Sequence, residues 1–398
     1  MPGQSPLSMM RPPVQQVQKP GGRHGRRRAW PIITLVVIVI GLALVWVGLW
    51  YYAASVADRT LAGWVEREAA AGRSYSCGSQ SIGGFPLRIE ARCVDAAVEI
   101  KNQTPPYAVK AKSVNFAAEV WRPTRLIGDV TGPLALSQAG QPLIVADWTR
   151  ARVTVRGVPP DPESVFAELD GSHLDRAGGT GESLFKAEHA NLEARIAAGS
   201  ARDNPVIAVT LHLKAATAPT LHSALAAPID AELEAVVRGF KDLSPKPWAD
   251  RFREMQATGG GIEIKSLRIA QTDVIVVGAG TLSVNAHGKL DGLVRVAIVG
   301  IERLVPVLGI DRLIAQGIDR LSGSNGSAAQ AAGALDRLIP GLGGALRESA
   351  NSSLIENLKK MGQPSSIGKQ PAIVLPLRFV DGAIYLGMLR VGEAPPLF

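Results

Sequence analysis

Alternation of apolar and polar residues at every second position is the main pattern of the chain beyond residue 72. In 229–237 the odd-numbered positions are Ile, Ala, Leu, Ala and Val, and the even-numbered ones include Asp230, Glu232 and Glu234. This period of two is typical of a β-strand with one buried face. Similar patterns predict strands at 87–101, 109–120, 134–137, 143–156, 183–197, 205–214, 261–269, 274–277, 280–287, 292–299, 372–380 and 383–391.

These strands follow one another with short breaks, and Asp381-Gly382 between the last two is a hairpin signal. Strands with one polar face in succession indicate an antiparallel sheet. Helical spacing interrupts the pattern at 248–256 and again near residues 302–361. The predicted fold class is therefore α+β and β-rich, with a long, mainly antiparallel sheet. The helical block near 302–361 either lines a lipid cavity or covers one sheet face as ordinary core, and the second interpretation is favoured.

A different pattern occupies the start of the chain, where residues 29–57 hold no charged side chain and 32–52 are almost entirely apolar. At 1.5 Å per residue such a helix spans about 32 Å, which matches the hydrocarbon core of a bilayer. Trp30 lies at one edge of this run, and Trp50, Tyr51 and Tyr52 lie at the other, as interfacial aromatic residues do. The pattern predicts a transmembrane anchor at 29–54, a helical stalk at 55–72 and a β-rich domain at 73–398.

The anchor could instead be a cleaved signal peptide, with Ala53 and Ser55 as small residues before the cut. The apolar run is longer than the roughly 7–15 residues of a signal peptide, so an uncleaved anchor is favoured. Arg26, Arg27 and Arg28 flank the run on its N-terminal side. Positive residues stay in the cytoplasm, so we expect a cytoplasmic N-terminus and a translocated C-terminal domain.

The net charge of +8 comes mostly from the N-terminal tail. Residues 1–28 hold six basic residues and no acidic one, and are rich in Pro, Gly and Gln. This composition predicts a disordered cytoplasmic tail, whose charges set the membrane orientation or attract anionic headgroups. Because residues 58–398 are nearly neutral, a nucleic-acid partner is not expected.

Cys77 and Cys93 are the two cysteines of the chain, and the turn signal Gly83-Gly84-Phe85-Pro86 lies between them. A hairpin at this turn would bring the two sulfur atoms close together, although the strand register could prevent it. In a translocated domain a disulfide is chemically allowed. The alternative is two unpaired buried thiols.

No motif of catalysis, cofactor binding or metal binding is recognisable, so we expect a protein that is not an enzyme and has no cofactor or metal. The carboxylates Asp161 and Glu163 lie in a proline-rich segment that reads as a solvated loop. Gly278-Ala279-Gly280 begins like a dinucleotide-binding loop but has Ser283 in place of the third glycine. The six histidines show no metal-ligand spacing: they are His24, His173, His189, His212, His222 and His287.

Two segments resemble a known family. Cys77, the segment GFPLRIE at 84–90 and Cys93, after a single N-terminal anchor, are similar to the bacterial family catalogued as domain of unknown function 2125. The ending FVDGAIYLG at 379–387, followed by APPL at 394–397, is similar to the C-terminal hairpin of that family. The resemblance implies a periplasmic domain held at the bacterial inner membrane, with no assigned activity.

The glycine-punctuated segment 259–292 also resembles hairpins of AsmA-type envelope proteins. That likeness implies a lipid-handling role in envelope maintenance. We therefore expect a module that binds lipid or another apolar ligand on the apolar face of its sheet. The alternative is a structural scaffold that docks a protein partner of the envelope.

Overall fold

The structure is a computed structural model that describes residues 29–101, 105–158, 161–178, 183–244, 246–308, 355–387 and 389–398. The chain divides into two compact units, Met1–Ser55 and Val56–Phe398. Helix α1 (Ala29–Ala70) supplies the described part of the first unit and continues into the second.

Helix α1 is long and apolar enough to cross a membrane over Trp30–Ala70, with a mean hydropathy of 3.0 in its most apolar window. None of that window is buried by the rest of the protein. The predicted anchor and stalk therefore lie on one continuous helix as far as Ala70. Composition and length make α1 a candidate membrane-spanning helix.

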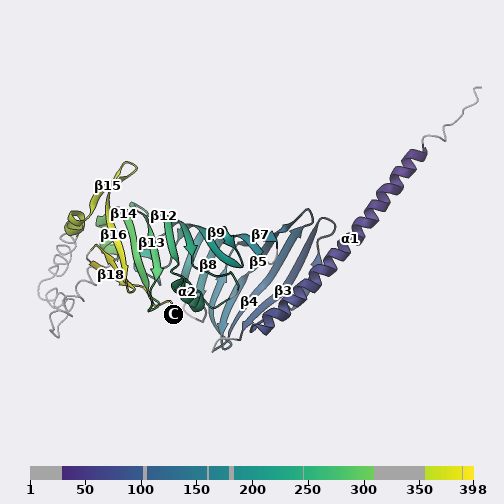
Figure 1. The fold of residues 1–398 in the computed structure, drawn as a ribbon, viewed down its shortest axis with the longest axis horizontal. Helices are drawn as coiled ribbons and strands as arrows, with labels where there is room; N and C mark the ends of the chain where they lie inside the picture. The colour runs from purple at the N-terminus through teal and green to yellow at the C-terminus, as the bar shows by residue number, and fades with distance from the viewer. Residues whose placement is uncertain are drawn as a thin grey trace, which may run out of the picture. The chain divides into compact units, whose positions relative to one another are not determined.

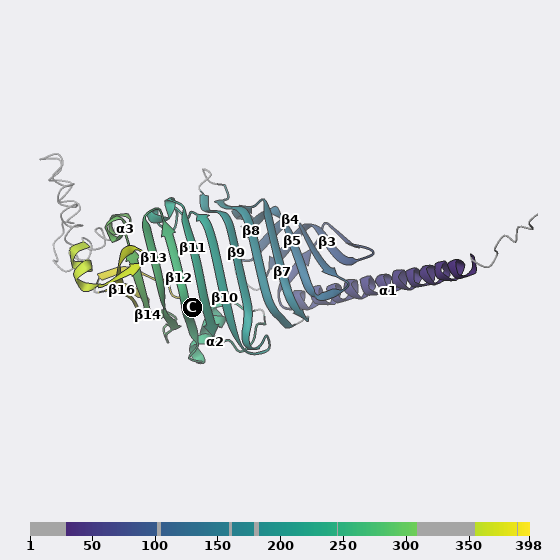
Figure 2. The ribbon, with the colours of Figure 1, turned by 90° about the horizontal axis from the view of Figure 1, so that it is seen from above.

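The strands of the second unit form one sheet, and every described pairing in it is antiparallel (Figures 1 and 2). The described strands are β1 (Arg73–Ser76), β2 (Ser79–Gly83), β3 (Arg88–Ile100), β4 (Tyr107–Glu119), β5 (Arg122–Gln138), β6 (Gln141–Asp147), β7 (Arg150–Val158), β8 (Asp161–Arg176), β9 (Ser183–Ser200), β10 (Asp203–Ala216), β11 (Ile229–Arg238), β12 (Gly261–Gln271), β13 (Val274–Val284), β14 (Leu290–Val299), β15 (Gln363–Ile367), β16 (Gln370–Val380), β17 (Ala383–Leu386) and β18 (Leu389–Glu393). Together with α1 they confirm the predicted fold class.

Neighbouring strands follow chain order through most of the sheet, as short antiparallel connections require. The order runs β3, β4, β5, β7, β8, β9, β10, β11, β12, β13, β14, β16. Strand β6 fills the space between the second half of β5 and the second half of β8. Strands β1 and β2 both pair with β3.

Three predicted strand boundaries are wrong, each for a local reason. The predicted strand 143–156 is split into β6 and β7 at Trp148, whose indole Nε1 donates to the carbonyl of Val130 at 2.8 Å. The predicted strands 274–277 and 280–287 are one strand, because Gly280 permits close approach to β14: a Cβ there would lie 2.2 Å from the Leu293 oxygen. The predicted strand 383–391 ends at Gly387, which has a φ of 62°, and resumes as β18.

The prediction of a solvated loop around Asp161 and Glu163 is also wrong, because β8 begins there. Pro162 lies opposite Gly157, next to a shift in register. At such an irregularity the strand pairing does not need the backbone amide hydrogen that proline lacks. The Asp161 carboxylate lies 2.6 Å from the Arg202 guanidinium. The sequence pattern also missed β1, β15 and the first half of β5.

The packed core lies at the C-terminal end of the sheet. It contains Val294, Val296, Ile298 and Leu375, together with Ile301, Leu358 and Leu386. Ile301 begins the short helix α3 (Ile301–Leu308), and Leu358 lies in a helix over 355–361. These two helices lie inside the predicted block 302–361, and residues 309–354 of that block are outside the described residues. At this end, ordinary core packing on the sheet is confirmed.

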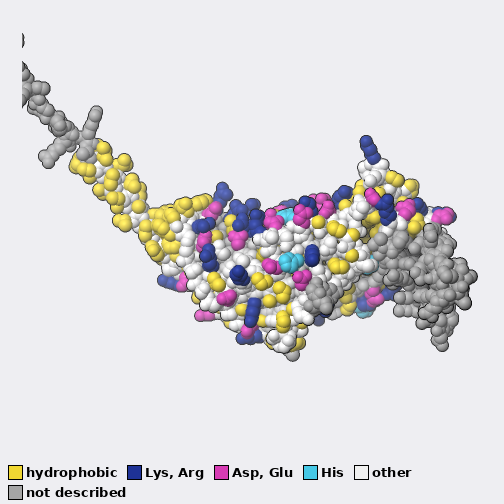
Figure 3. Space-filling view, turned by 180° about the vertical axis from the view of Figure 1, so that it is seen from behind, with side chains coloured by type: hydrophobic (Ala, Val, Ile, Leu, Met, Phe, Trp, Pro, Cys, Tyr) yellow, Lys and Arg dark blue, Asp and Glu magenta, His cyan; other side chains and the backbone are white. Residues whose placement is uncertain are grey.

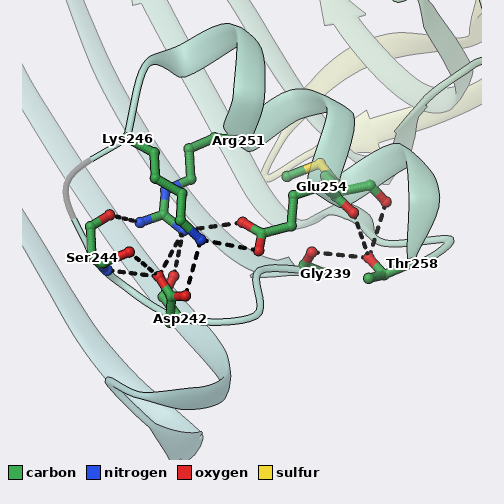
Figure 4. A network of polar contacts seen from close by, with 8 residues as sticks. Gly239, Asp242, Ser244, Lys246, Arg251, Glu254 and Thr258 are labelled. Carbon is green, nitrogen blue, oxygen red and sulfur yellow. Dashed lines mark hydrogen bonds and ion pairs between the residues drawn. The ribbon is translucent and has the colours of Figure 1, made fainter.

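Helix α2 (Trp248–Ala257) confirms the predicted helix 248–256, and a polar network ties it to the preceding loop (Figure 4). Arg251 is 7% exposed and donates to the carbonyl oxygens of Asp242 and Ser244. Its guanidinium also lies 3.1 Å from the Glu254 carboxylate, and the Lys246 ammonium lies 2.9 Å from that of Asp242. The pKa of Asp242 lies well below its ordinary value because the Ser244 hydroxyl and Lys246 donate to it.

We predict that Arg251→Ala loosens α2, because it leaves two carbonyl oxygens without this donor and leaves the Glu254 carboxylate with Lys246 as its remaining partner. The expected loss is on the order of 3 kcal/mol of unfolding free energy. Faster hydrogen exchange over 248–257 would show it. Arg253→Ala on the same helix is the control. Its side chain is 57% exposed, so the loss should stay within about 1 kcal/mol. Equal losses in the two variants would contradict the role given to Arg251.

Candidate functional site

One face of the sheet is apolar along ten consecutive strands, because the register aligns apolar residues across neighbouring strands. Leu211 of β10 lies between Leu192 of β9 and Leu233 of β11. Two further rows run beside this one. The three rows are Val130, Ala151, Leu169, Ala190, Leu213, Ala231, Ile269, Val276, Ile298 and Ile373; Gly128, Val153, Ala167, Leu192, Leu211, Leu233, Leu267, Gly278, Val296 and Leu375; and Leu126, Val155, Val165, Ala194, Val209, Ala235, Ile264, Gly280, Val294 and Leu377.

We call these three rows the apolar face. None of its positions carries a charge or a hydrogen-bonding side chain. Ten strands about 4.8 Å apart make it roughly 43 Å long across the strands. Such a surface is normally covered by another layer of the protein.

The large side chains of the apolar face are fully buried only at its C-terminal end, although Ala151 and Ala235 are also buried. On β14 and β16, Val294, Val296, Ile298 and Leu375 are at most 5% exposed, and they pack with α3 and the helix at 355–361. From β5 to β12, every Val, Leu and Ile of the face is half-buried or exposed. Leu126 and Leu192 are 38% and 42% exposed. The described residues therefore leave most of the apolar face open to a ligand.

A hollow of about 300 Å³ lies on the open part of this face. Leu169, Leu192, Leu211 and Leu213 line it, and Phe185 and Leu174 border it where the face continues toward β6. Most lining residues are apolar, and Asp147, Ser172, His173 and Asn191 also border the hollow. A mostly apolar lining favours a hydrocarbon ligand over a polar one.

The opposite face of the same strands is charged, and its charges are paired across the strands. The Arg152 guanidinium lies 2.7 Å from the Asp129 carboxylate, and that of Arg238 lies 2.6 Å from Glu263. The hydrogen bond to Asp129 raises the pKa of Arg152. Figure 3 shows acidic and basic side chains next to one another on one face of the molecule. Side chains at neighbouring positions of a strand therefore lie on opposite faces of the sheet, one hydrocarbon-like and the other charged.

Glu168, Asp170 and His189 come together on the charged face, with possible ligand atoms within 4.8 Å of one another. Two carboxylates and an imidazole can hold a divalent cation. Here the Arg150 guanidinium lies 2.7 Å from Glu168 and 3.7 Å from Asp170, and His189 Nδ1 lies 2.6 Å from Asp170. Because Arg150 already supplies positive charge to both carboxylates, the arrangement acts as an ion-pair network.

Sequence spacing missed this cluster because its members come from different strands. Asp170 of β8 is opposite His189 of β9, and only the register reveals the contact. His189 lies in β9, within the segment 183–197 that the sequence predicts as a strand. Gly278 and Gly280 lie inside β13 against β14, so they form no phosphate-binding loop.

The structure places Cys77 and Cys93 at disulfide distance, with sulfur atoms 1.98 Å and Cα atoms 5.5 Å apart. Strands β2 and β3 form the hairpin that the turn signal predicts, and Gln80 is opposite Cys93. The topology signal Arg26, Arg27 and Arg28 lies outside the described residues, as does His24.

Comparison with known proteins gives one match. The sequence model of a family described as an uncharacterized protein conserved in bacteria (DUF2125) matches residues 50–395. No curated protein matches the chain. No solved structure matches it either.

We predict that Cys77 and Cys93 are linked in the cell. A thiol-reactive reagent added to intact cells should modify neither residue before reduction and both afterwards. Replacing both by Ala should lower the unfolding free energy by on the order of 3 kcal/mol, since a crosslink of this length restricts the unfolded chain. Ser76→Ala and Ser79→Ala, which leave the cysteines in place, serve as controls. Modification of both cysteines without reduction would contradict the pairing.

Proposed function

We propose that this chain, which belongs to the uncharacterized bacterial family DUF2125, is a non-enzymatic, membrane-anchored envelope protein that binds lipid hydrocarbon on its apolar face. The observation that carries the proposal is the open part of the apolar face, from β5 to β12. Contiguous apolar surfaces larger than a few hundred Å² on a folded protein mark binding sites. Each Å² that a ligand covers stabilises the complex by about 25 cal/mol.

A lipid fits this surface better than a small polar ligand does. The apolar face offers no hydrogen-bond donor or acceptor from its side chains, so it can orient only hydrocarbon. Its length of roughly 43 Å exceeds the ~15 Å of one bilayer leaflet. More than one acyl chain can therefore lie along it.

The candidate membrane-spanning helix, which would lie in a lipid bilayer, directly precedes the sheet in the chain. Strand β1 begins at Arg73, directly after α1 ends at Ala70. An uncleaved α1 would keep the sheet at a bilayer from which lipids can be taken. The likeness of 259–292 to AsmA-type envelope proteins supports the same role.

We place the sheet in the periplasm and α1 in the inner membrane, with the N-terminus in the cytoplasm. Two features support this topology. Arg26, Arg27 and Arg28 precede the apolar run, as cytoplasmic flanks do. Cys77 and Cys93 lie at disulfide distance, and disulfides persist in oxidising compartments such as the periplasm.

Photo-crosslinking in intact membranes tests the proposal with the full chain. A photoreactive phenylalanine analogue at Leu192 or Leu211 faces the hollow, whereas the same analogue at Glu193 or Thr210, which lie opposite each other on β9 and β10, faces the charged side of the same strands. We expect phospholipid adducts, detected by mass spectrometry, at Leu192 and Leu211 and none at the two control positions.

Two results would overturn the proposal. Lipid adducts of equal yield at all four positions would show adventitious contact with the membrane. Protein adducts at Leu192 and Leu211, with no lipid, would show that the chain is a scaffold that docks an envelope protein.

A charge on the apolar face should remove the bound lipid. Leu211→Glu puts a carboxylate where an acyl chain would lie, and burying an unpaired charge there is strongly unfavourable. We expect this variant, extracted into nanodiscs, to retain much less phospholipid than the natural protein. Thr210→Glu, the control on the opposite face, should retain the normal amount. Equal lipid content in the two variants would contradict the assigned face.

A further inference from the structure

Two turns at one end of the sheet expose large apolar side chains side by side. Phe85 and Leu87, in the turn between β2 and β3, are 51% and 52% exposed. Trp121, in the turn between β4 and β5, is 56% exposed. The amide of Val120 donates to the carbonyl of Leu87 at 3.1 Å, so the two turns adjoin. We call Phe85, Leu87, Val120 and Trp121 the aromatic tip.

The composition of the aromatic tip is that of a surface at a membrane interface. Trp and Phe concentrate at the level of lipid headgroups, where an apolar ring and a polar edge are both accommodated. Arg88 and Arg122 directly follow the two turns. The Arg88 side chain is 61% exposed, although it also pairs with Glu90, and Arg122 is exposed. Guanidinium groups at such positions can donate to lipid phosphates.

Contacts within the second unit show which way β1 and β2 lead. Residues later in these strands contact residues earlier in α1. The Arg73 guanidinium lies 2.5 Å from the Glu68 carboxylate, and the ring centroids of Tyr75 and Trp64 are 4.6 Å apart. The Gln80 amide donates to the Asp58 carboxylate at 3.4 Å. The chain therefore returns along the Val56–Ala70 part of α1, in the direction of Val56. The turn with Phe85 and Leu87 comes directly after β2 in this direction.

We infer that the aromatic tip inserts into the surface of the same bilayer that α1 enters. The apolar run ends at Tyr52, only six residues before Asp58 in the sequence, and Gln80 of β2 contacts Asp58. A lipid surface accounts for both properties of the tip, its exposed rings and its adjacent arginines. This contact goes beyond lipid binding by the apolar face and would hold even if that face bound no lipid.

Fluorescence from single labels tests the inference in the full chain. Because Cys77 and Cys93 lie at disulfide distance, one added cysteine can carry the label. Leu87→Cys and Trp121→Cys report on the tip. Gln141→Cys is the matched control, since it lies exposed beside the turn at the other end of β5. Each is labelled with a polarity-sensitive nitrobenzoxadiazole dye and reconstituted in vesicles of phosphatidylcholine and phosphatidylglycerol.

Blue-shifted emission at positions 87 and 121 is expected, with loss of emission when nitroxide-bearing phospholipids are included. Position 141 should show neither change. Emission and quenching at 87 and 121 equal to those at 141 would overturn the inference. A blue shift that nitroxide lipids do not quench would also overturn it, because the tip would then contact protein, such as a second copy. Two separate tip positions keep the test valid if one variant fails to fold.

Discussion

Cross-strand register is the constraint on which the rest of the structure depends. In an antiparallel sheet, a slip of one residue moves every side chain of a strand to the other face. Leu211 lies between Leu192 and Leu233, and such a slip in β10 would put Thr210 or His212 there instead. Because this register is kept across ten strands, the three apolar rows hold no charge, and the opposite face holds cross-strand ion pairs such as Arg152–Asp129 and Arg238–Glu263. Register thus creates a continuous apolar surface from residues that are ordinary strand formers individually.

That surface is not matched by an equally large core. Full burial of large side chains is concentrated around β14 and β16, with Leu358 and Leu375 at 0% exposure. Elsewhere in the described sheet, cross-strand pairs and backbone hydrogen bonds hold the strands together, and most of the large apolar side chains remain partly open. A ligand on the open part of the apolar face would add the missing layer. Binding of such a ligand would therefore be coupled to fold stability, since a ligand that prefers the folded chain stabilises it by mass action.

The sequence predicted those features that short stretches of chain determine. Strict alternation in 229–237 was enough for β11, and the Gly-Phe-Pro turn was enough for the hairpin that brings Cys77 and Cys93 together. The start of β8 was not predicted because it contains Pro162, and proline normally argues against a strand. In the structure Pro162 lies beside a shift in register, where proline is tolerated. The open apolar face, the Asp170–His189 pair and the adjoining turns of the aromatic tip depend on contacts between strands. No periodicity within a single strand encodes them.

The two proposed surfaces meet at the ends of the first long strands. Ile89 of β3 lies opposite Ala118 of β4, which lies opposite Leu126 of β5, the first residue of one row of the apolar face. Ile89 and Ala118 are two residues from Leu87 and Val120 of the aromatic tip. If the tip lies in the bilayer surface, these strand ends begin at the membrane. An acyl chain could then pass from the leaflet to the apolar face along continuous apolar side chains, without exposure to water. Transfer through water costs about 0.8 kcal/mol for each CH₂ group, so a continuous path favours lipid exchange over a detached binding site.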